Sequence, residues 1–360
     1  MGIAERLAMG SEQHNEQRYH SLQVSEVIDE TADARSLVLK VPPELSARFD
    51  YLPGQFLTFR VPCDGKQLVR CYSLSSSPHC DSQLKVTVKR VAKGRVSNWL
   101  NDNVQAGDRL QVMAPAGHFH LDDSERPLVL FGGGSGITPV LSILKSALRI
   151  SQRPIKLIYA NRDEPSVIFK DALLQLAKAH SEQLQVVHRL DSLQGYLTPG
   201  EVRRAVQEHA EAEFFICGPG PFMDTVERTL LSLDIDPQRV HVERFASPPD
   251  PDIVLAQEHA ARQASAGSAT TTLTVQLDGQ QHEVAYVAGS TLLQSCKSAG
   301  LEVPSSCEEG FCGACMCQVL EGETVLANND VLSVKELADG WTLACQSRPT
   351  SVRMSVKFPD

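Results

Sequence analysis

Apolar and polar positions divide the chain into three segments with different periods. Between residues 20 and 122, short alternating runs are separated by Pro and Gly, as in S-L-Q-V-S-E-V, Q-F-L-T-F-R-V and L-K-V-T-V-K-R-V. A period of two is the spacing of half-buried strands. Many short strands with turn signals predict an antiparallel β-barrel over these residues.

The pattern changes between residues 123 and 246. Apolar runs are each followed by a helical stretch, beginning with P-L-V-L-F, I-K-L-I-Y-A, L-Q-V-V-H and E-F-F-I-C-G. This alternation predicts an α/β domain whose parallel sheet is covered on both faces. Residues 247–271 have the composition of a linker, and residues 1–19 that of a flexible arm. Residues 272–360 predict short strands and one helix near 291–299.

Four cysteines in the last segment have the spacing of a plant-type [2Fe–2S] cluster. Cys307, Cys312 and Cys315 form a C-x4-C-x2-C run, and Cys345 follows at a distance. Structural zinc favours two C-x2-C pairs, and disulfide frameworks belong to small secreted chains, so the spacing favours the cluster. Cys317 is interpreted as a buried thiol rather than a ligand.

A glycine-rich turn, G-G-G-S-G-I-T-P, follows the first strand of the middle segment. Glycines at a strand-to-helix turn let the backbone approach a pyrophosphate, and the helix N-terminus adds N–H donors. Glycine turns alone are common, but a strand before and a helix after make this one more specific. The glycines that the pattern predicts to cradle a nicotinamide nucleotide are Gly132, Gly133, Gly134 and Gly136.

The run C-G-P-G-P-F-M ends what the pattern indicates is the last strand of this sheet. Ligands in open α/β sheets bind at the carboxyl ends of strands, which places Cys217 and Gly218 near the nicotinamide ring. Cys217 is also compatible with a plain buried thiol. A packing and orienting role is favoured over a nucleophilic one, because no histidine or paired carboxylate is evident nearby.

The barrel segment holds R-C-Y-S, in which Arg70 and Tyr72 share one face of a strand and Ser73 lies on the other. An arginine for a diphosphate, an aromatic for a flat ring and a hydroxyl for a ring nitrogen suit a flavin. The run suits a barrel strand with a surface charge equally well. Gly94 and Ser97 support the flavin, because they would open a helix whose N-terminus can hold the diphosphate.

The charge is −10, and residues 272–360 carry −6 of it, from 5 Lys/Arg against 11 Asp/Glu. This balance predicts a basic docking site on a protein partner and argues against nucleic acid; an ordinary solubilising surface is the alternative. No apolar run is long enough to span a membrane. Without an apolar signal core, the 10 cysteines predict a cytoplasmic protein.

These motifs occur in a specific order: R-x-Y-S, G-x-x-S-x-x-L, G-G-G-S-G-I-T-P and C-G-P-x-x-F-M. In this order the chain resembles the ferredoxin–NADP reductase superfamily, and its C-terminal ferredoxin module resembles reductase components of multicomponent oxygenases. The stretches R-C-Y-S-L-S-S-S-P, K-V-T-V-K-R, Y-A-N-R-D-E, S-V-I-F and H-V-E-R-F look closest to the reductase component of 3-ketosteroid 9α-hydroxylase. The phenylacetyl-CoA epoxidase reductase looks like a near relative.

The resemblance implies an FAD-binding barrel, a nicotinamide-binding α/β domain and an α+β ferredoxin module of the β-grasp type. It implies that Ser73 and Cys217 lie at the reacting rings and that NADH is the donor, with NADPH as the alternative. Arg162 would invite a 2′-phosphate, whereas Asp163 would repel it. The cofactor contacts it implies are Arg70, Tyr72, Ser73, Gly94 and Ser97 for FAD, Gly132 to Thr138 with Cys217 and Gly218 for the nucleotide, and Phe245 over the second flavin face.

The expected function is hydride transfer from NADH to FAD and single-electron transfer through the cluster to a terminal oxygenase of the 3-ketosteroid 9α-hydroxylase (Rieske) type. The alternative within this class is a reductase for a phenylacetyl-CoA epoxidase or another aromatic-compound oxygenase. Two hypotheses come from other functional classes. One is a redox sensor. The other is a nitric-oxide dioxygenase-like flavoprotein, but this would need a globin domain, which the short N-terminal arm cannot contain. The length of the linker predicts a ferredoxin module that swings between the flavin and the oxygenase. The prolines in the linker favour the alternative, in which the module is packed permanently against the reductase.

Overall fold

The computed structural model divides the chain into two compact units, residues 1–244 and 245–360. The predicted arm, the linker, Phe245, Cys307 and Cys312 lie outside the described residues. The structure describes residues 19–63, 65–244, 272–286, 289–301, 303–305, 308, 310, 313–327, 329, 331–332 and 334–359.

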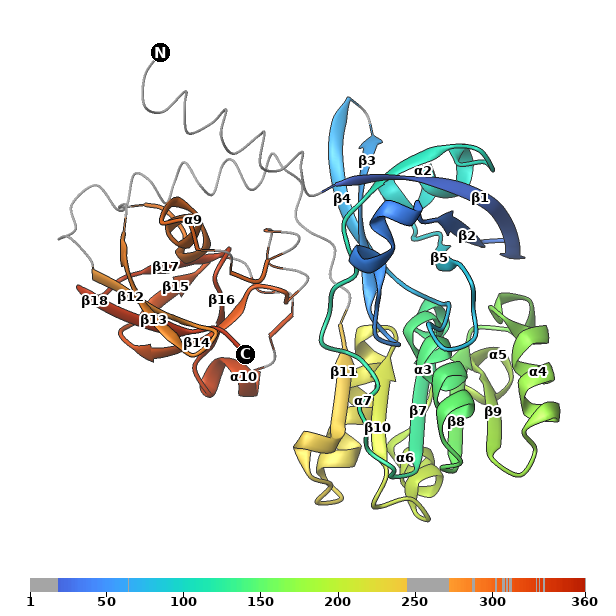
Figure 1. Cartoon of the computed structure of the whole chain (residues 1–360). Helices are drawn as coiled ribbons and strands as arrows, with labels where there is room; N and C mark the ends of the chain where they lie inside the picture. The colour runs from blue at the N-terminus through green and yellow to red at the C-terminus, as the bar shows by residue number, and fades with distance from the viewer. Residues whose placement is uncertain are drawn as a thin grey trace. The chain divides into compact units, whose positions relative to one another are not determined.

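The first part of the 1–244 unit is the predicted antiparallel barrel (Figure 1). Its strand order is β4-β3-β6-β1-β2-β5, and an isolated bridge between Leu74 and Val86 connects the two end strands. Closure removes the exposed sheet edges. The elements are β1 His20–Thr31, β2 Ala34–Lys40, η1 Pro43–Phe49, β3 Phe56–Cys63, β4 Lys66–Ser73, β5 Leu84–Lys89, α2 Arg95–Asn103 and β6 Arg109–Val112.

A five-stranded parallel sheet follows, in the order β11-β10-β7-β8-β9. The chain runs outward from β7 to β9 and then returns to the other side of β7, so the strand order reverses between β7 and β10. The prediction that β10 is the last strand of this sheet was wrong, because β11 forms the edge beyond it. The strands are β7 Leu128–Gly133, β8 Ile155–Asn161, β9 Leu184–Leu190, β10 Glu213–Cys217 and β11 Val240–Glu243.

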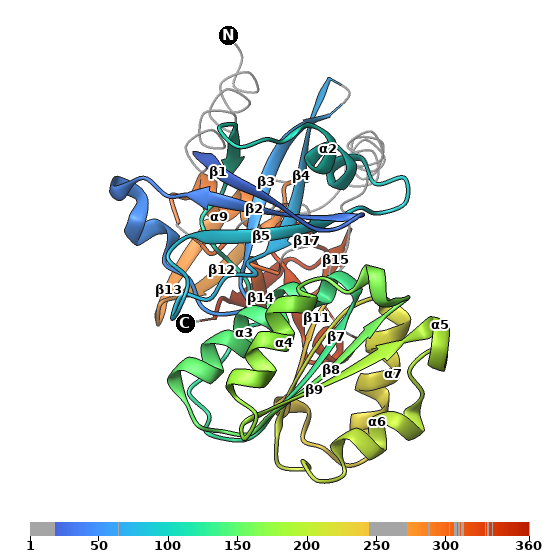
Figure 2. The same cartoon turned by 90° about the vertical axis from the view of Figure 1, so that its right-hand side faces the viewer.

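Helices cover both faces of this sheet, as predicted (Figure 2). On β10, Phe215 and Cys217 pack into the apolar cluster under α3 and α4, whereas Phe214 and Ile216 pack under α6 and α7. This is the alternation expected of a buried parallel strand. No helix among the described ranges is long and apolar enough to cross a membrane. The helices are η2 Gly134–Gly136, α3 Ile137–Ile150, η3 Glu164–Ser166, α4 Lys170–Ala179, α5 Asp191–Gln194, α6 Pro199–Val206, α7 Gly220–Leu231 and η4 Pro237–Arg239.

Helix α3 joins the barrel to the sheet through buried hydroxyl groups. The Ser142 hydroxyl donates to the carbonyl of Ser76 at 2.6 Å and accepts from the N–H of Gly54 at 3.3 Å. One turn later, the hydroxyls of Ser146 and Ser77 are 2.7 Å apart. Because these groups are buried, losing either partner would leave an unsatisfied polar atom. The helix that follows the glycine turn is therefore held against the segment that follows the R-C-Y-S strand.

The 245–360 unit has the predicted α+β composition, with a mixed sheet in the order β13-β12-β18-β14-β16. The helix expected near 291–299 is present as α9, and Thr291 caps it by accepting from the N–H of Gln294 at 3.2 Å. The short helix α10 was not predicted. The elements are β12 Thr272–Leu277, β13 Gln280–Ala285, α9 Leu292–Ser298, β14 Met316–Glu321, β15 Thr324–Leu326, α10 Val334–Ala338, β16 Trp341–Leu343, β17 Ser347–Pro349 and β18 Arg353–Lys357.

Candidate functional site

Ser73 ends β4, opposite Phe56 on β3. Its side chain is buried, with 2% exposure, and its hydroxyl has no hydrogen-bond partner among the described residues. Buried polar groups are almost always paired, so an unpaired one indicates a ligand that completes it. The predicted partner, a flavin ring nitrogen, fits this requirement.

Tyr72 and Arg70 share one face of β4, as predicted, and their register partners Leu57 and Phe59 belong to the barrel core. Tyr72 packs edge-on against Phe59 with ring centroids 5.7 Å apart, and burial raises the pKa of its phenol. The Arg70 guanidinium donates to the carbonyl of Val69 at 2.7 Å. Arg70 is partly buried. This placement favours the flavin interpretation over a plain surface charge.

Gly94 is the N-cap of α2, as the sequence predicted. A Cβ at this position would lie 2.6 Å from the Ser97 hydroxyl oxygen and 2.9 Å from the Cβ of Val91. The Ser97 hydroxyl accepts from the N–H of Val91 at 3.2 Å, and the Asn98 amide donates to the carbonyl of Gly94 at 2.6 Å. Ser97 therefore shapes the turn before α2, where the helix N-terminus suits an anion.

The glycine turn after β7 is tight because two backbone segments approach each other. A Cβ on Gly136 would lie 2.2 Å from the carbonyl oxygen of Cys217, and one on Gly133 would lie 2.8 Å from the ring of Pro219. Gly218 is equally restricted, since its Cβ would come within 2.9 Å of the Gly133 Cα. Gly134 has a positive φ of 53°. Only residues without a Cβ allow this approach.

Gly132 and Cys217 are register partners on neighbouring parallel strands, at the point where the strand order reverses. Thr138, the remaining residue predicted for the nucleotide, is the second residue of α3 and donates to the carbonyl of Ser135 at 3.0 Å. Ligands of open α/β sheets bind at such switch points. The predicted cradle and the predicted nicotinamide-side cysteine therefore lie at one place.

A carboxylate that the sequence analysis did not find accompanies Cys217. Glu243 on β11 is the register partner of Cys217, so a single carboxylate that the sequence did not indicate lies beside this thiol. Although part of its surface is accessible, burial raises the pKa of Glu243 to about 8. Burial, together with the Glu243 charge, also raises the pKa of the Cys217 thiol, which keeps this thiol protonated.

Asn161 ends β8, and both its side-chain nitrogen and its side-chain oxygen are buried without a hydrogen-bond partner in the described parts of the chain. Its exposure is 3%. On the same strand, the Tyr159 hydroxyl donates to the carbonyl of Gly134 at 3.1 Å and so supports the glycine turn. Burial raises the pKa of the Tyr159 phenol, and the Asn161 amide lies close enough to that hydroxyl to oppose the rise. The amide has no well-aligned partner among the described residues, which indicates a polar ligand at the end of β8. The sequence placed Asn161 with Arg162 and Asp163 after the second strand of this sheet, where ribose contacts are expected, and this role stays a prediction.

Arg162 and Asp163, the predicted readers of the adenosine ribose, follow Asn161. The Arg162 guanidinium donates to the Asp163 carboxylate at 2.9 Å, and Asp163 also accepts from the N–H of Ser166, which caps η3. The pKa of Arg162 is raised, first by this hydrogen bond and further by the charges of Asp163 and Asp33. The positive charge of Arg162 is therefore already compensated by the Asp163 and Asp33 carboxylates.

Cys315 and Cys345 are the predicted cluster ligands that the structure describes. Both are buried, and their segments meet where the N–H of Ala344 donates to the carbonyl of Cys315 at 3.0 Å. Gly313, inside the predicted C-x4-C-x2-C loop, has a positive φ of 70°. The amide of Gln346 donates to the carbonyl of Glu308 in the same loop at 3.0 Å. The segments that carry Cys315 and Cys345 therefore meet, as ligation of one cluster by both cysteines requires.

Cys317 lies inside β14 opposite Thr342, with no exposed surface. Burial raises the pKa of its thiol, with smaller contributions from Cys315 and Cys296. A buried thiol of raised pKa is inert. The interpretation of Cys317 as a core residue agrees with this position.

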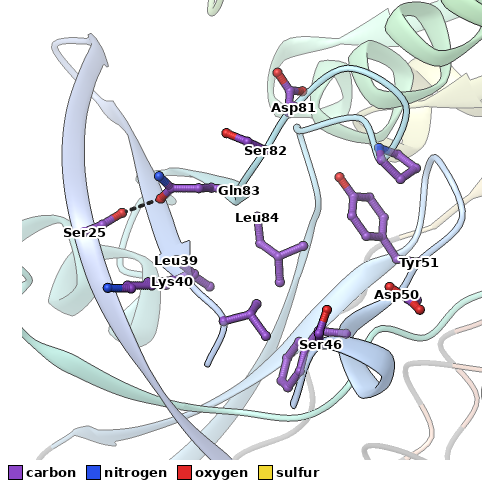
Figure 3. A pocket seen from close by; sticks show the side chains of 13 residues that line it. Ser25, Leu39, Lys40, Ser46, Asp50, Tyr51, Asp81, Ser82, Gln83 and Leu84 are labelled. Atoms are coloured by element: carbon purple, nitrogen blue, oxygen red, sulfur yellow. Dashed lines mark hydrogen bonds between the residues drawn. The ribbon is translucent and has the colours of Figure 1, made fainter. Parts of the chain in front are cut away.

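A hollow of about 770 Å³ lies on the barrel between the end of β2 and the loop before β5 (Figure 3). Across its mouth, the Ser25 hydroxyl donates to the side-chain oxygen of Gln83 at 2.8 Å. Tyr51 and Asp81 line the other side, as Figure 3 shows. None of the predicted cofactor residues lines this hollow, so we assign it no role in the cofactor sites.

Three family models match the chain in the order of its segments. They are the oxidoreductase FAD-binding domain over residues 21–121, the oxidoreductase NAD-binding domain over 130–228 and the 2Fe-2S iron-sulfur cluster binding domain over 275–350. The matches agree with the unpaired Ser73 hydroxyl, the glycine turn and the meeting of the Cys315 and Cys345 segments.

Curated relatives match along nearly the whole chain. The ferredoxin reductase component of the 3-ketosteroid-9-alpha-monooxygenase of Rhodococcus rhodochrous is 45% identical over 94% of this chain and 96% of its own. A component of the 1,2-phenylacetyl-CoA epoxidase of Escherichia coli is 32% identical over 94% and 98%. The solved structure of phthalate dioxygenase reductase, which transfers electrons from pyridine nucleotides to [2Fe–2S], superposes with a TM-score of 0.57 at 26% identity, over 96% of this chain and 99% of its own. The chain therefore belongs to the family of oxygenase reductase components that carry FAD-binding, NAD-binding and [2Fe–2S] domains.

Proposed function

We propose that this chain is the electron-supplying component of a 3-ketosteroid 9α-hydroxylase-type oxygenase, with NADH as its donor. The observation that carries the proposal is the 45% identity over 94% of the chain to a relative of that name, against 32% to the epoxidase component. The partner is then a terminal oxygenase of the Rieske type. The chain does not need to contact the steroid, because only electrons pass between the components.

Bound FAD supplies the conversion of a two-electron hydride transfer into single-electron transfers. The residues of this chain position the reactants. Ser73 offers its unpaired hydroxyl to the flavin ring, and Tyr72 packs on that ring. Arg70 and the N-terminus of α2 at Gly94 hold the diphosphate. Cys217 closes the opposite side of the site as a protonated, space-filling thiol.

The nucleotide is held by the glycine turn at the switch point, and Asn161 pairs with its polar atoms. The preference for NADH follows from the surroundings of Arg162. Because Asp163 and Asp33 already match its charge, a 2′-phosphate would face carboxylates as well as the guanidinium. Asp163→Asn keeps the cap of η3 but removes one negative charge. We expect it to raise the kcat/KM for NADPH by about tenfold, with little change for NADH.

The experiment that tests the proposed function compares two oxygenases. The purified chain, loaded with FAD and iron–sulfur cluster, is mixed with NADH and either a 3-ketosteroid 9α-hydroxylase oxygenase component or a phenylacetyl-CoA epoxidase oxygenase. We expect hydroxylated steroid at a rate that depends on this chain, and little epoxide. If product forms only in the mixture with the phenylacetyl-CoA epoxidase oxygenase, this chain is the reductase of that system instead. An artificial acceptor such as ferricyanide serves as the control for intact NADH oxidation.

A further inference from the structure

A row of buried hydroxyl groups crosses the outer face of the flavin barrel. The hydroxyls of Ser75 and Thr87 are 2.9 Å apart, and those of Thr87 and Ser36 are 2.7 Å apart. The Ser36 hydroxyl then donates to the Oε1 atom of Glu30 at 2.5 Å. All three hydroxyl residues are at most 4% exposed. Ser36 on β2 and Thr87 on β5 alternate with apolar residues of the barrel core, such as Val86, so their side chains lie outside that core.

The nucleotide-binding part of the same unit covers this face. Strand β5 contacts the glycine turn Gly134–Gly136, and the Nζ of Lys85 lies 5.5 Å from the ring centroid of Phe169. Ala34, where β2 begins, belongs to the same apolar cluster as Ile137 at the start of α3. Figures 1 and 2 both show β5 on the side of the barrel that faces α3. The hydroxyl row therefore lies between the flavin barrel and the nucleotide turn.

Glu30 stands at an irregularity of β1. The pairing with β2 shifts between Asp29, opposite Arg35, and Thr31, opposite Ala34. A β-bulge leaves one residue unpaired and redirects its side chain, and bulges are frequent beside active sites. Burial raises the pKa of Tyr159, and the Glu30 carboxylate adds to this effect. Tyr159 is the residue whose hydroxyl supports Gly134, so Glu30 faces the nucleotide turn.

The hydroxyl row fixes the carboxylate in place. The Ser36 hydroxyl donates to Glu30, so the Thr87 hydroxyl must donate to Ser36. The Ser75 hydroxyl lies within hydrogen-bond distance of both Thr87 and the carbonyl of Lys85. This arrangement holds Oε1. Among the described residues, Oε2 receives no hydrogen bond in the structure. Glu30 is partly exposed, so this side chain is accessible to a ligand.

We propose that Glu30 accepts a hydrogen bond from a hydroxyl of the ribose on the nicotinamide side of the nucleotide. This inference rests on the proposed use of a nicotinamide nucleotide. The glycine turn takes the pyrophosphate and Cys217 marks the nicotinamide, so the ribose that joins them lies beside the turn, opposite Glu30. A carboxylate accepts from hydroxyls and repels phosphates. The flavin barrel thus contributes a positioning residue to the nucleotide site.

A series of truncated ligands tests the proposal on the oxidised, fully loaded protein. NAD⁺ and ADP-ribose both contain this ribose, whereas ADP lacks it. We expect Glu30→Gln to weaken the binding of NAD⁺ and ADP-ribose by about tenfold and to leave ADP binding unchanged. Ser36→Ala frees the carboxylate and should weaken the same two ligands by a smaller factor. Glu26→Gln, an exposed carboxylate on the same strand, is the matched control and should change none of them.

Calorimetric titration with the three ligands separates the outcomes. Equal weakening of ADP would mean that the substitution distorts the glycine turn, and it would overturn the proposal. Unchanged binding of all three ligands would overturn it as well. If Glu30→Gln lowers the FAD content, the Ser36→Ala titration decides in the same way. Because these titrations contain no oxygenase, failure of the proposed function would appear separately, as absent coupling in the oxygenase assay with the unchanged chain.

Discussion

The glycine turn after β7 and the R-C-Y-S strand β4 form their sites in opposite ways. The turn works through missing side chains, because a Cβ on Gly136 would lie 2.2 Å from the Cys217 carbonyl oxygen. The strand works through present ones, because the Ser73 hydroxyl is buried at 2% exposure with no partner in the described chain. The packing of the glycine turn is complete in the protein alone, whereas the hydrogen bonding of Ser73 on β4 becomes complete only when a ligand binds.

This difference teaches how each site should respond to substitution. In the turn, both contacting groups are backbone, so a clash has no flexible side chain to relieve it. On β4, removing a side chain takes away one interaction and leaves the fold in place. Backbone-built sites should therefore lose stability and binding together, whereas side-chain-built sites should lose chemistry without losing stability.

The cluster cysteines are the extreme case of a site built from side chains, and there we expect the largest effect. Cys345→Ser should abolish the visible absorbance and iron content of the cluster, because four thiolates are required. Cys317→Ser is the matched control on a nearby buried thiol and should retain both signals. Retention in the first variant and loss in the second would reverse the ligand assignment.

Gly136→Ala tests the backbone-built site. We expect it to reduce the free energy of unfolding by about 3 kcal/mol and to remove NAD⁺ binding, because the clash is with backbone. Gly134→Ala is the control in the same turn. There φ is 53° but no atom lies within 4 Å of the added Cβ, so only about 1 kcal/mol of backbone strain is expected. The free energies of unfolding are measured by urea titration. An equal loss of stability in Gly136→Ala and Gly134→Ala would contradict the expected difference between them.

Ser73→Ala tests the side-chain-built site and should separate stability from activity. Its hydroxyl makes no hydrogen bond in the described structure, so removing it should not lower the thermal unfolding midpoint of the protein without FAD. Reduction of bound flavin by NADH should slow by about tenfold or more in rapid-mixing measurements. A lower midpoint with an unchanged rate would show that Ser73 is structural.

The smallest expected effect concerns Glu243, whose pKa burial raises from its ordinary 4.5 to about 8. Between these values the folded protein keeps a proton that the unfolded chain has released. Stability that is present below pH 4.5 should therefore decline as the pH rises toward 8. Glu243→Gln cannot ionise and should flatten this dependence. Unfolding midpoints of both proteins from about pH 5 to about pH 9 provide the measurement, and parallel curves would count against the assignment.

Local signals in the sequence predicted much of the fold. The alternation in Q-F-L-T-F-R-V gave β3, and the glycine turn between a strand and a helix was found at the right place. Strand β11 was missed because its four residues, Val240–Glu243, are too few to establish a period of two. Missing it hid Glu243, although its register partner Cys217 was predicted correctly as a residue at the end of a strand.

The sequence by itself determined the spacing of the cysteines, the glycines that admit a close backbone approach and the order of the cofactor motifs. These depend on residues a few positions apart, where one local period or turn decides the structure. Only the tertiary structure placed Glu243 beside Cys217, left Asn161 unpaired at the end of β8 and turned Glu30 toward the nucleotide turn. Strand register and the packing of barrel against sheet arise from burial over the whole unit, so no short stretch of sequence contains them.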